Sequence, residues 1–256
     1  MTQLQTRGIA MIFGVALSLA AAPAFSADKA STWSYSGSTG PAKWGTLDKS
    51  FDMCADGQLQ SPIDIPDAKA RKGALPSLLF DYQPSALKIT DTGKMIQVNY
   101  APGSFVRVAG KKYELLRIDF HKPGEEKVNG KGHDMGVHLV HRAPDKTEGI
   151  VAVMLDIGAG NALVKAVMDN LPKDKNKESA VSGSTINAMD LLPKNKGYYT
   201  FSGSQTSPPC TEDVTWFVLK TPVTVSADQV ARFGRSYPMN ARPTQPMNAR
   251  DIQVTD

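Results

Sequence analysis

The sequence predicts a mainly β fold, and three observations support this. Short β-rich runs follow one another through most of the 256 residues, and 17 prolines and 21 glycines separate them. Only one segment has a clear helical period. The chain shows no internal repeat and no long linker, and at this size one hydrophobic core can be buried. We therefore expect a single β-dominated domain, assigned to residues 27–256, after a short leader.

Seven runs of β-branched, aromatic and other apolar residues are expected as strands. They are residues 95–100, 105–108, 113–120, 136–141, 150–155, 198–202 and 214–219. Residues 161–171 are expected as a helix, because apolar side chains recur at 163, 164, 167, 168 and 171, and Pro172 ends the pattern. The lysine-rich residues 173–178 that follow are expected to form a solvated loop.

The first 26 residues have the layout of a secretory signal peptide. Arg7 is their only charged residue, an apolar run extends from Ile9 to Ala22, and small residues follow at positions 22–26. The apolar run is shorter than the ~20 residues that a membrane-spanning helix needs. We expect residues 1–26 to be removed on export, so that the mature protein is periplasmic or secreted and has no membrane span.

Net charge and cysteine content restrict the possible functions and the compartment. Loss of Arg7 with the leader lowers the formal net charge from +4 to +3, which is too small to indicate nucleic-acid binding. The two cysteines, Cys54 and Cys210, would enter an oxidising compartment, where a single pair usually forms a disulfide. Two buried thiols are the alternative.

The four histidines of the chain are His121, His133, His138 and His141. Side chains alternate along a strand, so Asp119 and His121 share one face, and His138 and His141 point to opposite faces of their own strand. If the two strands pair, Asp119, His121 and one histidine of the second strand can meet. Three nitrogen or oxygen ligands with an open position are typical of a catalytic zinc site. From spacing alone, a packed structural histidine is the commoner outcome.

Seven short segments, taken in order, resemble the α-type carbonic anhydrases, in particular the exported bacterial members. Residues 60–65 read QSPIDI, residues 135–141 end in HLVH, and residues 202–210 read SGSQTSPPC. The other segments are WSYSG at 33–37, GPAKWG at 40–45, RPTQP at 242–246 and NAR at 248–250. Each motif is weak by itself, but their shared order covers nearly the whole mature chain.

The resemblance implies a large, twisted, mostly antiparallel sheet with a few short peripheral helices, and a zinc enzyme that converts carbon dioxide to bicarbonate. Matched by motif, the zinc ligands are Asp119, His121 and His138, and His141 is structural. Thr206 accepts a hydrogen bond from the attacking hydroxide and donates one to Glu125. Ser207 and Val140 line the substrate side, and Cys54 and Cys210 match the disulfide of exported members.

The metal site departs from the family pattern at several positions. Asp119 stands where the family has a histidine, and its charge would offset part of the metal's charge. Behind the ligands, Arg117 replaces a glutamine and Gly136 replaces a glutamate that orients the third histidine; losing such a partner typically costs 10–100-fold in affinity or activity. Lys94 replaces the proton-shuttling histidine, and lysine is a poor shuttle at neutral pH. Gln205 replaces an apolar residue of the cavity wall.

Two hypotheses remain open on the sequence. The first is a zinc-dependent carbonic anhydrase of reduced activity, in which Lys94 or buffer carries protons. The second is a zinc-free binding or structural protein on the same scaffold, in which Arg117 and Asp119 form an ion pair inside the cavity. A serine hydrolase is disfavoured, because the sequence has no Gly-x-Ser-x-Gly motif. Oligomeric state cannot be predicted from these patterns.

Overall fold

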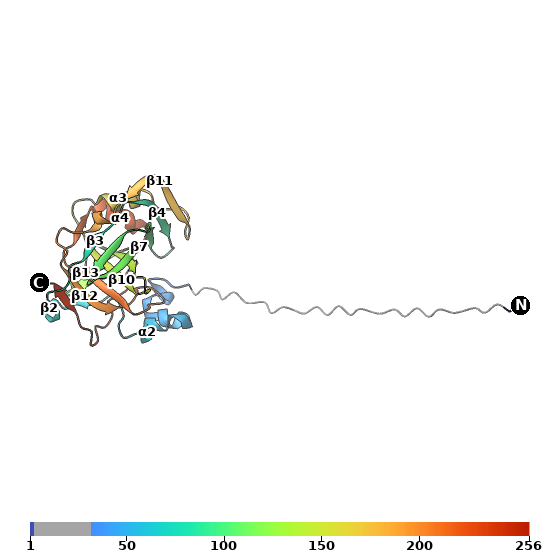
Figure 1. The fold of residues 1–256 in the computed structure, drawn as a ribbon, viewed down its shortest axis with the longest axis horizontal. Helices are drawn as coiled ribbons and strands as arrows, with labels where there is room; N and C mark the ends of the chain where they lie inside the picture. The colour runs from blue at the N-terminus through green and yellow to red at the C-terminus, as the bar shows by residue number, and fades with distance from the viewer. Residues whose placement is uncertain (3–31, 256) are drawn as a thin grey trace. The chain divides into compact units, whose positions relative to one another are not determined.

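The strands form where apolar side chains alternate or run without interruption, and they assemble into one large sheet (Figure 1). The structure is a computed structural model and describes residues 1–2 and 32–255. The predicted signal peptide falls almost wholly on residues outside this part and stays a prediction. Residues Ser31–Asp256 make one compact unit. Among the described residues, no helix has the length and apolar character that a membrane span requires.

The large sheet contains 13 strands, and most of its pairings are antiparallel, as predicted. Its main path runs β11-β4-β5-β7-β9-β10-β13-β12-β15-β2, and β3, β6 and β14 pair off this path. The strands are β2 (Arg71–Gly73), β3 (Leu79–Asp81), β4 (Ser85–Asp91), β5 (Ile96–Asn99), β6 (Phe105–Val108), β7 (Lys111–His121), β9 (Met135–Arg142), β10 (Glu148–Ile157), β11 (Glu178–Ile186), β12 (Tyr198–Gly203), β13 (Val214–Leu219), β14 (Val223–Val225) and β15 (Gln253–Thr255).

A second, two-stranded sheet and short helices complete the fold. Parallel pairing joins β1 (Asp64–Ile65) to β8 (Lys127–Val128). In the large sheet, parallel pairs join β10 to β13 and β14, and β15 to β2. The α-helices are α1 (Trp44–Leu47), α2 (Met53–Asp56), α3 (Ala162–Asp169) and α4 (Ala227–Ser236), and the 3-10 helices are η1 (Gly37–Thr39), η2 (Pro41–Lys43), η3 (Lys49–Phe51), η4 (Asp67–Lys69) and η5 (Ala188–Leu191).

All seven predicted strands are present, with ends that differ by a few residues, and the predicted helix is α3. Asn161 caps α3, because its side chain accepts a hydrogen bond from the backbone N–H of Val164. Among the longer elements, β4, β11 and α4 were not predicted from the sequence. Helix α4 begins with a capping box between Ser226 and Gln229, a local signal that the apolar pattern does not contain.

The two faces of the large sheet carry different clusters of buried side chains. Ile118, Phe120 and Leu139 belong to a core that also includes side chains from α3 and α4, which lie side by side near β11 (Figure 1). Val140 and Trp216 belong to a second cluster. Asp119 and His121 of β7 and His138 of β9 alternate with the residues of the first core, so they lie on the face that carries the second cluster.

Candidate metal centre

Strands β7 and β9 pair in a register that brings the predicted ligands together. Asp119 lies directly opposite His138, and His121 lies opposite Gly136. The side chains of Asp119, His121 and His138 are all buried. The rings of His121 and His138 lie side by side, with their centroids 4.5 Å apart. His133 is not part of this group: it contacts Asp156, with 2.6 Å between Nδ1 and Oδ1.

His121 is held by the chain segment that precedes Arg242. Its Nδ1 lies 3.0 Å from the carbonyl oxygen of Asn240, and Asn240 is itself fully buried and hydrogen-bonded to the backbone of Phe120 and Lys122. A carbonyl oxygen only accepts, so Nδ1 carries the hydrogen. The lone pair available to a ligand is therefore that of Nε2, which has no hydrogen bond within the described part of the chain.

His138 is held through the other ring nitrogen, Nε2. Its Nε2 lies 2.9 Å from Oε1 of Glu126, and its Nδ1 lies 3.8 Å from Oε2 of Glu125. The edge of Trp216 packs against the ring at a centroid distance of 4.9 Å. From the sequence, we expected His138 to lack a carboxylate partner, because Gly136 supplies none. That expectation is corrected here: Glu126, between β7 and β8, supplies the carboxylate instead.

Glu125 lies against both histidines. Its Oε1 accepts a hydrogen bond from the backbone N–H of Arg242 at 2.6 Å, and it lies 3.6 Å from Nδ1 of His121. Its Oε2 is buried and, among the described residues, has no hydrogen-bond partner. A buried carboxylate oxygen without a donor is costly unless a cation or proton satisfies it. This oxygen is therefore the point of the site at which a cation or a proton is needed.

Asp119 is engaged by Arg117 on the same strand. The Nε of Arg117 donates to both carboxylate oxygens of Asp119, at 2.9 and 3.2 Å. The group of side chains whose ligand atoms lie within 4.8 Å of one another consists of His121, Glu125 and His138, without Asp119. The structure thus brings together two of the three predicted ligands with Glu125, and it gives Asp119 a cationic partner.

Electrostatics make this site attractive to a cation. Burial by itself would lower the pKa of His138, but the carboxylates of Glu126, Glu125 and Asp119 outweigh it and raise that pKa to about 9. Burial, followed by the charges of Glu125 and Asp119, likewise raises the pKa of the nearby Tyr35 phenol. Without a metal, a proton on His138 therefore compensates part of the negative charge.

The residues fit a zinc ion on these grounds. Two imidazoles with one nitrogen free on each ring, together with carboxylate oxygens, form a donor set that zinc enzymes use. The unsatisfied Oε2 of Glu125 and the excess of acidic groups point the same way.

Thr206 is buried and Ser207 half-buried in the loop after β12, and no hydrogen bond joins Thr206 to Glu125 among the described residues. The orienting role predicted for Thr206 therefore stays a prediction. Lys94 lies in the turn between β4 and β5, with its Nζ 5.5 Å from the ring centroid of Trp33. Val140 is buried in the cluster that contains Trp216.

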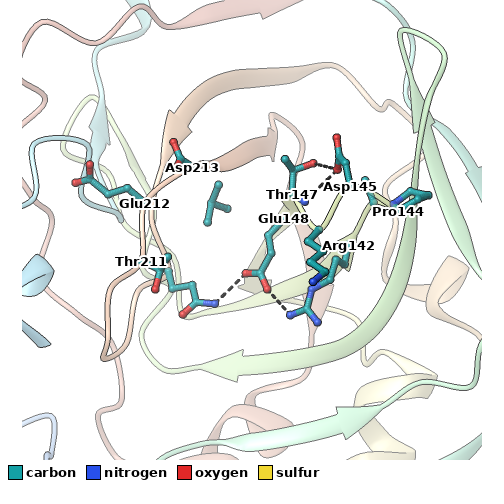
Figure 2. A pocket seen from close by; sticks show the side chains of 12 residues that line it. Arg142, Pro144, Asp145, Thr147, Glu148, Thr211, Glu212 and Asp213 are labelled. Atoms are coloured by element: carbon teal, nitrogen blue, oxygen red, sulfur yellow. Dashed lines mark hydrogen bonds and ion pairs between the residues drawn. The ribbon is translucent and has the colours of Figure 1, made fainter. Parts of the chain in front are cut away.

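A separate pocket of about 670 Å³ lies beside the loop that contains Gln205 (Figure 2). Gln205 donates to Glu148 at 2.9 Å, and Glu148 also accepts from Arg142 at 2.7 Å. Asp119 and the two paired histidines do not line this pocket. Gln205, predicted to replace an apolar residue of the cavity wall, thus directs its amide to an ion pair of this second pocket.

Comparison with known proteins decides the family. The family model described as eukaryotic-type carbonic anhydrase matches residues 39–256. The chain belongs to the α-carbonic anhydrase family. A carbonic anhydrase from Nostoc is 40% identical over 225 residues, which cover 87% of this chain and 85% of the relative. One from Neisseria gonorrhoeae is 36% identical, and the match covers 86% of each chain.

Solved structures agree. The α-carbonic anhydrase of Thermovibrio ammonificans, in complex with the inhibitor sulfanilamide, matches with a TM-score of 0.84 and 36% identity over 88% of this chain and 99% of that one.

The predicted disulfide of this α-carbonic anhydrase is confirmed: Cys54 and Cys210 are bonded, with their Cα atoms 5.1 Å apart.

Sequence reasoning missed Glu126 and Asn240, which fix the two histidine rings. For Glu126 a signal existed, since an acidic residue follows Glu125 directly while position 136 is glycine. Asn240 had no comparable signal, because its contact with His121 depends on a pairing of segments 119 residues apart.

Proposed function

We propose that the protein catalyses the zinc-dependent, reversible hydration of carbon dioxide to bicarbonate and a proton, with reduced activity. The observation that carries this proposal is the histidine pair. His121 and His138 lie with ring centroids 4.5 Å apart, and each ring has one nitrogen tied to the protein and the other left for a ligand. Membership in a family whose relatives are named carbonic anhydrase supports the reaction class.

In this proposal His121 holds zinc through Nε2 and His138 through Nδ1, and Asp119 is the third ligand predicted from the family motif. Zinc supplies a Lewis acid that makes hydroxide available near neutral pH. Asp119 would hold the metal in competition with Arg117, whose Nε lies 2.9 Å from its carboxylate. Glu125 is the alternative third ligand, because its Oε2 is unsatisfied.

The remaining residues prepare the substrate side. Val140 and Trp216 provide apolar surface beside the histidines, which suits an uncharged and weakly polar substrate. Thr206 and Glu125 are assigned to orient the attacking oxygen, and Ser207 to line the substrate side. Lys94, or buffer in its place, carries the proton to solvent.

We expect reduced activity because of the negative charge close to the metal site. Each carboxylate near the metal lowers the metal's effective positive charge, so water at the site is less readily deprotonated. Asp119 adds negative charge beside the histidines at a position where the family motif has a neutral ligand, and Arg117 compensates only part of it. We therefore expect turnover below that of a site with histidine at position 119.

A second candidate function is favoured by one contact. Arg117 donates to both oxygens of Asp119, and this is the ion pair expected of a zinc-free relative that binds a ligand or serves a structural role. In that case the guanidinium provides the positive charge that the metal would otherwise bring. The two candidates differ in whether the purified protein takes up zinc.

The proposed compartment is the periplasm or the cell exterior. The Cys54–Cys210 disulfide supports it, because such bonds persist mainly in oxidising compartments. The leader predicted for residues 1–26 would direct the export.

Stopped-flow carbon dioxide hydration by the mature protein, with zinc added, tests the proposal. We expect a rate above that of buffer alone, and a sulfonamide should abolish the excess. Zinc content of the same sample is measured in parallel. A rate equal to that of buffer, at a zinc concentration that saturates the protein, would refute the proposal. Absence of bound zinc would favour the second candidate.

A further inference from the structure

Glu126 is buried in the short connection between β7 and β8, and only 2% of its surface is exposed. Its carboxylate lies 2.9 Å from Nε2 of His138. A carboxylate oxygen accepts hydrogen bonds, so Nε2 of His138 donates in this contact.

Gly136 leaves the space that this contact needs. Residues 136 and 138 point to the same face of β9, because side chains alternate along a strand. A Cβ atom at position 136 would lie 3.9 Å from Oε2 of Glu126 and 3.2 Å from the Cα of Gly124. A larger side chain at 136 would compete with Glu126 for the volume beside the His138 ring.

We propose that Glu126 is the positioning residue of His138, reaching across Gly136 to hold the ring with Nδ1 directed towards Glu125 and His121. A donor at Nε2 leaves the lone pair on Nδ1 and makes that nitrogen a better metal ligand. Glu126, in the connection between β7 and β8, thus supplies the carboxylate that a glutamate at position 136 would supply in the family pattern. The inference rests on the proposed function only in taking the histidine pair as the metal site.

The alternative is that Glu126 and His138 form a merely structural ion pair. Two features argue against it. The ring of His138 keeps Nδ1 on the side of Glu125 Oε2, the oxygen that lacks a hydrogen bond within the described residues. Moreover, a Cβ atom at position 136 would lie 3.9 Å from Oε2 of Glu126, so a side chain placed there can take over the carboxylate's position, and an exchange of roles is testable.

The test measures zinc affinity by competition with a chromogenic chelator. Glu126→Ala should weaken binding by about 10–100-fold, since it removes the partner of a metal ligand. Glu126→Gln keeps an acceptor without the charge, and its loss should be smaller. The exchange variant Glu126→Ala with Gly136→Glu should recover most of the affinity. Glu178→Ala is the matched control, because Glu178 is an exposed acid that pairs with Lys88.

Wild-type affinity in Glu126→Ala would overturn the proposal, as would a folded exchange variant that binds zinc no better than Glu126→Ala. If the exchange variant does not fold, the His138 ring orientation in metal-free crystals of Glu126→Ala decides. A rotated ring supports the positioning role, and an unchanged ring contradicts it. The same crystals test Glu126 even if the wild-type protein binds no zinc, an outcome that would refute the proposed function alone.

Discussion

His138 and His141 lie three residues apart on β9, yet they are in opposite electrostatic surroundings. His138 faces the carboxylates of Glu126 and Glu125, which raise its pKa to about 9 despite burial. His141 is on the other face, where its Nδ1 lies 3.3 Å from the carbonyl of Gly149 and its Nε2 lies 2.8 Å from the Tyr82 hydroxyl. There burial dominates and lowers the pKa of His141 to about 4.

A histidine that binds a ligand differs from a structural one in whether a ring nitrogen is left without a hydrogen-bond partner. His141 donates from Nδ1 and accepts at Nε2, so the neutral ring is fully satisfied within the protein. His138 donates from Nε2 to Glu126, and its other nitrogen lies near an unsatisfied carboxylate oxygen. Spacing along the strand places the two rings on different faces, and their neighbours determine the role.

The largest effect is expected from His138→Ala. Loss of one of the two imidazole ligands should weaken zinc binding by roughly a thousandfold or more, because the remaining donors cannot complete the coordination. Chelator competition measures the affinity, and circular dichroism checks that the variant is folded. Zinc binding close to that of the wild type would show that the metal lies elsewhere.

His141→Ala should instead reduce stability. It removes a fully buried ring and leaves the hydroxyl of Tyr82 without its partner, at a cost of about 2–4 kcal/mol in the free energy of unfolding. Urea denaturation measures this cost. Tyr82→Phe is the matched variant and should cost less, since it leaves the packing in place. A weaker zinc affinity in folded His141→Ala would contradict the division of roles between the two histidines.

Restoring a histidine at the first ligand position should raise activity by about tenfold. Asp119→His removes a negative charge from the metal site, and Arg117→Gln removes the guanidinium that would then lack a partner. The double variant is compared with the wild type and with each single variant in stopped-flow hydration. No gain in the double variant would place the limitation elsewhere, at Lys94 or at the exchanged pair of Glu126 and Gly136.

The stability of the metal-free protein should depend on pH through both histidines, in opposite directions. The folded pKa of His138 lies above its ordinary value of 6.5, so its contribution is complete below pH 6.5 and lost as the pH rises through about 9. The folded pKa of His141 is lower than 6.5, so its contribution is present above pH 6.5 and lost as the pH falls towards 4.

Urea midpoints measured from pH 4 to 10 test this dependence. In His138→Ala the loss of stability above pH 6.5 should become smaller, while the loss on the acid side should stay. An alkaline limb of unchanged steepness in that variant would show that other groups, and not His138, cause it.

The sequence predicted seven strands of the large sheet because their apolar residues alternate or run continuously, and it predicted opposite faces for His138 and His141 by the same alternation. It missed β11, whose small polar residues at 179–185 carry no apolar period and whose pairing with β4 is interrupted by an irregularity. Glu126 was missed for another reason. The acid at 126 and the glycine at 136 are both visible in the sequence, but that the two positions are neighbours in space follows from the pairing of β7 with β9.

The central claim is that His121 and His138 together hold a metal ion, and anomalous diffraction from zinc-soaked crystals tests it most directly. We expect one strong peak at the zinc edge within coordination distance of Nε2 of His121 and Nδ1 of His138, and the same map identifies Asp119 or Glu125 as the third ligand. Crystals without a peak between the two rings, at a zinc concentration that fills exposed sites, would contradict the account.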